Sequence, residues 1–277
     1  MKVQSLCAQS STLESRLIFC PPYFFGVVNG SSEFRHPDDK PRLFDGKTGG
    51  QLAANMICSA ISKASATECL AMILSDANRE LSKIIKETKL HRNEPETFPS
   101  ASFAIVKVTD DGICVVQGGN CLMVWRMKDG TLHATSNGMY EYEKDMLCAV
   151  ETSARNARGD KNKIWRDNIL PFAQRYREEI NAVQGGFSLF NGQLVSCGFW
   201  KNFELSREDV ARLLLFTEGA VPFDWTLSPK ILAKRVMADF DFLGLNKLIE
   251  SSHIAFDEKR GKSKDDYPDA AVLAIEF

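Results

Sequence analysis

Apolar residues recur along this chain with two different spacings, and the change between them predicts helices and strands. Apolar positions three and four residues apart predict helices over 51–61, 66–86 and 164–180. Short apolar runs between turn residues predict strands instead. The predicted strands cover 17–28 (interrupted by Cys20-Pro21-Pro22), 101–108, 113–118, 122–127, 132–136, 185–195, 202–216 and 270–277.

Two segments mark helix starts. Thr48-Gly49-Gly50 opens the first helical pattern, and Ser228-Pro229 combines a capping hydroxyl with a proline in the first turn. The second start predicts a helix over 231–240, followed by a short helix near 245–252. The segments 31–46 and 146–162 are mostly polar, so no element is predicted there.

The order of these elements predicts the fold class. Asp-Gly turns at Asp111-Gly112 and Asp129-Gly130 separate the runs within 101–136, which favours an antiparallel meander. Strands in clusters and helices in pairs predict an α+β fold, a four-layer α-β-β-α sandwich with two antiparallel sheets flanked by helix pairs. Because we find no repeat and no Pro/Gly-rich linker, we expect a single domain over residues 1–277.

Composition narrows the functional classes. A hydrophobic share of 44% and a charged share of 25% are ordinary for a soluble globular protein. The net charge of −2 argues against attraction to nucleic acid or to an anionic membrane. The chain has no apolar stretch long enough for a signal peptide or a membrane span. We therefore expect a cytoplasmic protein that binds neither nucleic acid nor membrane.

The eight cysteines include no Cys-x-x-Cys pair, which favours buried thiols in a reducing compartment over disulfides or zinc ligands. Cys20 and Cys121 lie near the candidate site described next, and either packing or reactivity is open to them, with packing favoured. The four histidines show no metal-ligand spacing.

Oxygen-bearing side chains stand where four apolar strands meet a turn. Rigid strand ends that converge on one point suit a hard divalent cation, which binds oxygen ligands. The alternative is that these are ordinary turn residues, since Asn, Gly and Asp border strands in many proteins. The side chains are Asn29, Asn120, Glu218 and the acidic group Asp265, Asp266 and Asp269.

In order, these motifs resemble the metal-dependent protein phosphatases of the 2C type. Segments 24–30 and 49–54 resemble the family's strand, Asp-Gly turn and Gly-Gly helix start, and 115–124 its Gly-Asp-Ser turn between strands. Segment 214–219 resembles its Thr-Asp-Gly motif, and 264–275 its closing acidic turn and strand. The resemblance implies Mn²⁺ or Mg²⁺, one or two ions, activating a water that attacks phosphoserine or phosphothreonine in a protein.

The same resemblance implies the site residues. Asn29, Glu218 and Asp266 fall on catalytic positions, and Asp265 and Asp269 remain alternatives to Asp266 for the last ligand. The backbone carbonyl of Gly30 matches one that helps to hold a metal. The implied ligand set is Glu14, Asn29, Gly30, Glu218, Asp266 and Asp269.

The chain departs from the family pattern at several positions. Asn29 stands where the family has an aspartate that bridges two dications, and Ser15 replaces the aspartate of a Glu-Asp pair. Without an anion between them the ions repel, which predicts weaker or single-metal binding. Ser31 replaces a general-acid histidine, and Asn120 replaces the Gly-Asp-Ser aspartate and is not expected to be a ligand. No residue matches the phosphate-binding arginine, although Arg16 and Arg35 are neighbours.

Asp45-Gly46 is a second candidate for the Asp-Gly turn. The apolar run 23–28 is more strand-like than 42–44, so we prefer Asn29, with Asp45 on a loop nearby. Two functions follow: a divergent metal-dependent phosphatase acting on a phosphorylated protein, or a catalytically silent phosphatase-like module that binds a protein partner. The fold by itself does not decide between them. A third reading is an unrelated sandwich with polar turns.

Overall fold

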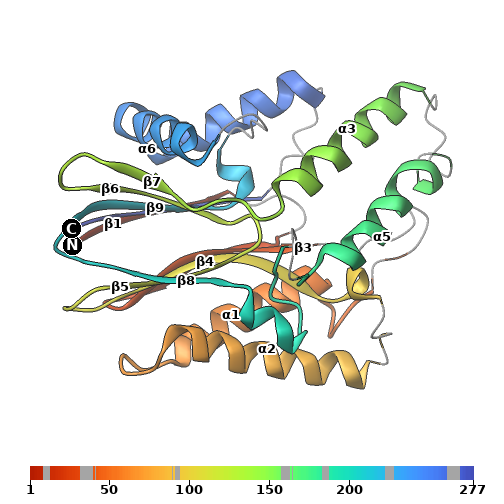
Figure 1. Ribbon diagram of the computed structural model, residues 1–277, viewed down its shortest axis with the longest axis horizontal. Helices are drawn as coiled ribbons and strands as arrows, with labels where there is room; N and C mark the ends of the chain where they lie inside the picture. The colour runs from red at the N-terminus through yellow and green to blue at the C-terminus, as the bar shows by residue number, and fades with distance from the viewer. Residues whose placement is uncertain are drawn as a thin grey trace.

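The computed structural model describes residues 1–8, 13–31, 40, 42–88, 90, 94–156, 163, 165–182, 187–221, 228–260 and 269–277. Two five-stranded antiparallel sheets face each other, and helices cover both outer faces (Figure 1). This arrangement confirms the predicted α+β sandwich. No helix in the described part of the chain combines the length and hydrophobicity needed to cross a bilayer.

Each sheet joins strands that are distant in sequence. The first sheet has the order β1 (Lys2–Ala8), β10 (Ala270–Glu276), β9 (Val210–Phe216), β6 (Leu122–Met127) and β7 (Leu132–Ala134). The second has the order β2 (Ser15–Cys20), β3 (Phe24–Ser31), β4 (Ser100–Val108), β5 (Ile113–Gly118) and β8 (Lys201–Leu205). Strand β1, which the sequence pattern did not indicate, pairs with β10 at the edge of the first sheet.

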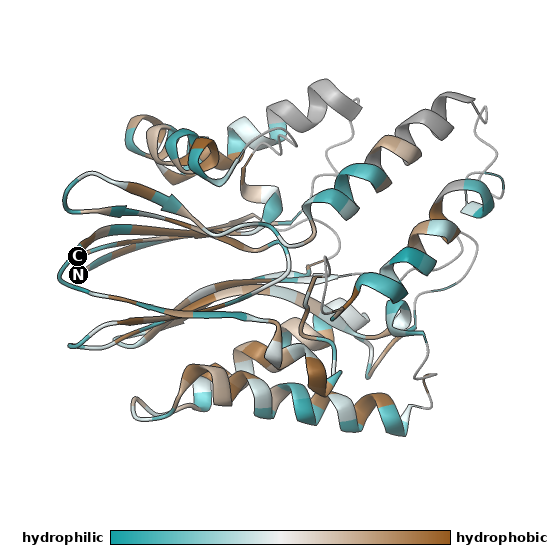
Figure 2. Ribbon diagram, in the orientation of Figure 1, coloured by the Kyte–Doolittle hydropathy of each residue, from teal (hydrophilic) through white to brown (hydrophobic). Residues whose placement is uncertain are grey.

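Successive side chains along a strand point to opposite faces of the sheet, so one sheet contributes to two hydrophobic cores. In β3, Phe25 and Val27 face the other sheet, whereas Phe24 and Val28 face the helices. Because both faces are buried, the strand reads as a continuous apolar run. Figure 2 shows the resulting concentration of apolar residues along both sheets.

Helices α1 (Gly49–Lys63) and α2 (Leu70–Glu87) cover the second sheet. Helix α1 starts after Thr48, as predicted. The Thr48 hydroxyl accepts the Gln51 N–H, and the Gln51 side chain accepts the Thr48 N–H, which together form a capping box. Helix α2 begins at Leu70 rather than at 66, after a separate turn in which the Glu68 carboxylate accepts the Ser65 N–H.

The predicted meander over 101–136 is wrong in its middle. Strands β4 and β5 form one hairpin and β6 and β7 another, but β5 and β6 lie in different sheets. The chain crosses between them at Gly119-Asn120. Gly119 has a φ of 73°, and a Cβ there would overlap the Ser102 side chain, so the crossing requires glycine.

Two further segments differ from their predictions. The predicted strand 185–195 is absent from its described part: Phe187 and Phe190 form isolated bridges, and 194–198 forms a 3₁₀ turn. Asn78 explains part of this, because its side chain, rather than a neighbouring strand, accepts the Gly192 N–H. Residues 185–186 of that prediction lie outside the described residues.

The polar segment after 139 contains helix α3 (Tyr140–Asn156), which projects from the end of the sandwich beside α5 (Leu170–Glu179) (Figure 1). Helix α5 begins later than predicted, after a π-helical turn at Trp165–Ile169. A small cluster that includes Tyr142, Tyr176 and Phe187 holds this unit together. A few aromatic contacts therefore stabilise α3, although its sequence lacks an extended apolar stripe.

The first sheet is covered by α6 (Pro229–Arg260), which merges the two helices predicted after Ser228. The Ser228 hydroxyl accepts the Ile231 N–H, as the capping signal implies. At Gly244 the backbone is non-helical, with φ 73°, and the helix bends there.

Candidate functional site

One end of the sandwich brings together strand ends from both sheets. Asp269 precedes β10 of the first sheet, whereas Ser15 begins β2 and Asn29 lies near the end of β3 in the second. The Asp269 Oδ2 accepts the Ser15 N–H at 3.0 Å and also the Glu14 N–H. We call Glu14, Ser15, Asn29, Thr48 and Asp269 the Asn29 corner.

The centre of the Asn29 corner is a neutral pair. Ser15 and Asn29 lie directly opposite each other in the register of β2 and β3. The Ser15 hydroxyl donates to the Asn29 Oδ1 at 3.0 Å. Both residues at this point of the sheet are therefore uncharged, and the carbonyl oxygen of Asn29 already accepts a hydrogen bond.

Glu14 is buried at the start of α1. Its Oε1 accepts the Thr48 hydroxyl at 2.7 Å, and its backbone carbonyl accepts the Gly30 N–H at 3.1 Å. A Cβ on Gly30 would overlap the Gly50 carbonyl, and a Cβ on Gly50 would lie 2.7 Å from the Glu14 Oε1. Close approach of backbones therefore explains this glycine pair, and the metal-holding role of the Gly30 carbonyl stays a prediction.

A second cluster, the Asn120 corner, consists of Asn120, Asn137, Glu143 and Glu218. The Asn120 Nδ2 donates to the Glu143 Oε1 at 2.6 Å and to the Glu218 Oε2 at 2.9 Å. The Asn137 Nδ2 donates to the Glu143 Oε2 at 3.1 Å. The opposite orientation of the Asn120 amide would set its oxygen against two carboxylates, so these contacts define the orientation shown. The Asn120 Oδ1 is buried and accepts no hydrogen bond within the described part of the chain.

Burial controls the charge in the Asn120 corner. It raises the pKa of Glu143 well above its usual value of 4.5, and the Glu218 carboxylate raises it further. Hydrogen bonds from Asn137 and Asn120 to the Glu143 carboxylate act in the opposite direction but are smaller effects. Glu143 therefore resists ionisation at this position.

Cys121 lies between the two corners. Burial is the main cause that raises the pKa of its thiol, and the charges of Glu218 and Glu143 add to it. A hydrogen bond from the Asn29 backbone N–H to the sulfur only partly offsets them. The thiol stays protonated and packs, as favoured for Cys121 from the sequence.

The remaining predicted residues have different outcomes. Asp266 and Asp265 lie outside the described residues, as does Arg35. Asp45 is exposed in the tight turn between Phe44 and Lys47. The Arg16 guanidinium donates to the Ser15 carbonyl at 2.8 Å, so it lies beside the Asn29 corner.

Sequence reasoning missed Glu143 and Asn137. Neither follows a predicted buried strand directly, and α3 itself was not predicted, so nothing in the sequence pattern placed Glu143 near Glu218. Asn120 was correctly found at a strand end. Its contacts show a bridge between two carboxylates.

The described residues do not fit a two-metal centre. Mg²⁺ and Mn²⁺ need several oxygen ligands, most of them anionic. Nowhere in the described ranges do three or more His, Cys, Asp or Glu side chains come together in a way that could hold a metal ion. The Asn29 Oδ1 and the Asp269 Oδ2 are hydrogen-bonded to protein donors instead.

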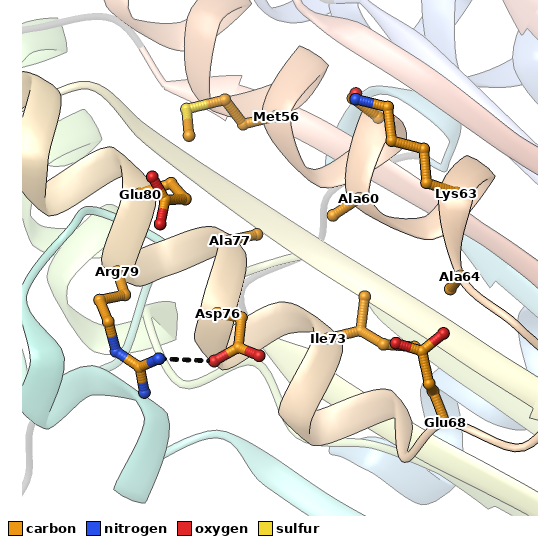
Figure 3. Close-up of a pocket in the computed structure, with 11 residues that line it drawn as sticks. Met56, Ala60, Lys63, Ala64, Glu68, Ile73, Asp76, Ala77, Arg79 and Glu80 are labelled. Atoms are coloured by element: carbon orange, nitrogen blue, oxygen red, sulfur yellow. Dashed lines mark hydrogen bonds and ion pairs between the residues drawn. The ribbon is translucent and has the colours of Figure 1, made fainter.

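Two hollows accompany these clusters. A cavity of about 120 Å³ lies against Glu143 and Ser31, beside the Asn120 corner. A wider groove of about 580 Å³ lies between α1 and α2, towards the far end of α1 (Figure 3). Arg79 and Asp76, both on α2, form an ion pair of 2.8 Å on one side of the groove. Lys63, Glu68 and Glu80 also line the groove, so it carries charges of both signs and favours no ligand class.

No protein-family model and no curated protein matches the sequence. Solved structures do match the fold over nearly the whole chain. The catalytic domain of the serine/threonine protein phosphatase PstP, solved with two manganese ions, has a TM-score of 0.56 at 11% identity and covers 99% of this chain and 96% of that chain.

Two further structures give similar agreement. Serine/threonine phosphatase Stp1 from Staphylococcus aureus has a TM-score of 0.55 at 8% identity, covering 100% of this chain and 94% of that one. PppA, described as a key regulatory component of T6SS in Pseudomonas aeruginosa, has a TM-score of 0.56 at 12% identity, with 100% and 97% covered. The chain thus has the fold of 2C-type phosphatase domains, as the sequence resemblance implied.

Proposed function

We propose that this chain is a catalytically silent module of the 2C phosphatase fold, which binds a protein partner, phosphorylated or not, at the end of the sandwich. The observation that carries the proposal is the hydrogen bond between the uncharged pair Ser15 and Asn29. In the related fold the sequence resemblance assigns both positions to aspartates. Here both are neutral, and the Ser15 hydroxyl donates to the Asn29 Oδ1.

Charge arithmetic supports the loss of metal-dependent hydrolysis. Two dications a few ångströms apart repel each other, and an anion between them offsets this repulsion. Asn29 supplies no negative charge there. The Asp269 Oδ2 and Glu14 Oε1 already accept protein hydrogen bonds that connect β2, β10 and α1, so a cation would compete with these donors for the same oxygens.

Manganese calorimetry, paired with turnover of p-nitrophenyl phosphate, tests this proposal. We expect neither micromolar Mn²⁺ affinity nor metal-dependent turnover in the native protein. We also expect Asn29→Asp to gain Mn²⁺ affinity, because it restores a carboxylate between Ser15 and the acidic residues. Native turnover that depends on Mn²⁺ would overturn the silent module, and an Asn29→Asp variant that still binds no metal would show that Asn29 is not the decisive position.

A second candidate is a weak, single-metal phosphatase. One observation favours it: three carboxylates are retained at one end of the fold. Glu14 and Asp269 belong to the Asn29 corner, and Glu218 belongs to the neighbouring Asn120 corner. Asp266 would be the further ligand of this candidate. It predicts micromolar Mn²⁺ binding and turnover that Glu218→Ala abolishes, with exposed Glu80→Ala as the control.

A further inference from the structure

The cavity of about 120 Å³ lies where α3 and α5 meet the end of the second sheet. Ser31 and Ser100, which are register partners in β3 and β4, form one wall, and Glu143 connects the cavity to the Asn120 corner. Its volume equals about four liquid waters, which accommodates the end of one side chain. Ser31 is half-buried, so the cavity reaches the surface two residues beyond Asn29.

Two buried carboxylates line this cavity, and among the described residues only Glu96 has a cationic partner. Glu96 forms an ion pair with Arg177, whose Nε and Nη2 each donate to one oxygen of the carboxylate. Glu143 is 7% exposed and, within the described ranges, accepts hydrogen bonds only from the amides of Asn120 and Asn137. A buried carboxylate without a counter-ion is costly, and a cation in the cavity would relieve that cost.

The other walls indicate which cation fits. The rings of Tyr142 and Tyr176 and the side chain of Met139 provide an apolar, aromatic lining. The Tyr142 hydroxyl donates to the Phe172 carbonyl at 3.0 Å, so its oxygen is already engaged. The Arg175 guanidinium lies over the Tyr142 ring, 5.7 Å from its centroid, so this ring already attracts one cation. Aromatic faces beside a carboxylate attract an organic ammonium group. A divalent metal ion lacks the ligands it needs, because the described residues contain no suitable group of three.

We propose that this cavity binds the ammonium end of a lysine side chain from the protein partner, with Glu143 as its counter-ion and the serine hydroxyls as acceptors. The stem of the lysine would lie along the methionine and tyrosine walls, as long cationic side chains do on apolar surfaces. The assignment to a protein partner rests on the proposed function, whereas ammonium binding as such does not.

Three probes test the inference in the absence of phosphate and metal. Nα-acetyl-lysine methylamide carries the proposed group, Nα-acetyl-norleucine methylamide has the same stem without charge, and n-butylamine represents a free amine. By NMR titration of the whole chain, we expect the lysine derivative to bind best. Glu143→Gln should weaken it at least about tenfold, since the ion pair is buried. Glu80→Gln, which removes the same charge from the exposed groove of Figure 3, should leave it unchanged.

A second variant keeps the test decisive if Glu143→Gln fails to fold. Ser31→Leu places an apolar side chain at the mouth and should abolish binding without touching Glu143. Equal binding of the norleucine probe, undiminished binding to folded Glu143→Gln or Ser31→Leu, or no binding of either amine overturns the ammonium site. Binding of n-butylamine as tight as that of the lysine derivative overturns the assignment to a protein side chain. These outcomes leave the silent-module proposal untouched, because neither phosphate nor metal is present.

Discussion

The Asn29 corner and the Asn120 corner lie at the same end of the sandwich but treat buried charge in opposite ways. In the Asn29 corner, a neutral Ser15-Asn29 pair replaces the acids that the resemblance implies, and Asp269 accepts two backbone N–H groups. In the Asn120 corner, Glu143 and Glu218 share one amide group. The described protein groups satisfy the carboxylates of the first cluster by hydrogen bonds. In the second cluster the buried Glu143 has no cationic partner among the described residues.

The contrast teaches where ligand chemistry remains in this fold. A cluster whose donors and acceptors are matched gains little from a cation and would lose hydrogen bonds by accepting one. A buried carboxylate without a positive partner is costly until a cation or a proton arrives. Cation binding at this end of the molecule should therefore be governed by Glu143, and the Asn29 corner should act as a structural joint between the sheets.

The largest effect should come from breaking the Asn120 corner with Asn120→Asp. This change sets a third carboxylate against Glu143 and Glu218 and removes both amide hydrogen bonds. We expect a loss of about 3 kcal/mol in the free energy of unfolding at neutral pH, measured by urea denaturation. The exposed Asn202→Asp, on β8, is the matched control and should change stability little. A variant as stable as that control would contradict the charge-bridging role of Asn120.

The next test sharpens the comparison through pH. Glu143 has a folded-state pKa above its ordinary value of 4.5, so the stability it contributes is present below that value and is lost as the pH rises towards the folded pKa. Glu143→Gln keeps the neutral form at every pH. Its stability relative to the native protein should rise by up to about 1.4 kcal/mol per pH unit within that window. Parallel urea series between pH 4 and pH 8 measure this difference, and two parallel curves would argue that Glu143 is not strained by burial.

Converting the neutral corner into an acidic one should have a smaller effect. Asn29→Asp adds a carboxylate beside the buried Cys121 and close to Asp269, and we expect a loss of about 1–2 kcal/mol without divalent cations. Added Mn²⁺ should recover this stability by mass action, while leaving the native melting temperature unchanged. Thermal melts of the variant and of the native protein, each with and without Mn²⁺, check both expectations. Equal responses of the two proteins would mean that the corners do not differ in their demand for cations.

The smallest expected effect is that of Thr48→Ala. It removes the hydroxyl that caps α1 and donates to the Glu14 carboxylate, so we expect a loss of about 1 kcal/mol in unfolding free energy. Thr48→Ser keeps both contacts and should stay close to the native value. If the two variants behave alike, the hydroxyl is not what satisfies Glu14.

The sequence pattern predicted much of the fold because local physics dictates it. Two strands, Phe24–Ser31 and Ala270–Glu276, are buried on both faces, so their apolar runs are continuous. The helix start at Thr48-Gly49-Gly50 is a local signal that needs no tertiary information. Prediction failed where stability comes from distant partners. Helix α3 depends on aromatic contacts with Tyr176 and Phe187, and β1 depends on β10 at the other end of the chain.

The sequence alone determined the sandwich, the strand-end positions of Asn29, Asn120, Glu218 and Asp269, and the uncharged side chain at position 29. Only the tertiary structure decided which of these residues meet. Asp269 joins Ser15 and Asn29, whereas Glu218 joins Asn120 and Glu143, because the chain crosses between the sheets at Gly119. Hydrogen-bond partners such as Asp269 and Ser15, 254 residues apart, or Glu218 and Asn120, 98 residues apart, leave no periodic trace in a sequence. Their proximity is set by how the two sheets stack, and so is the charge balance at this end of the fold.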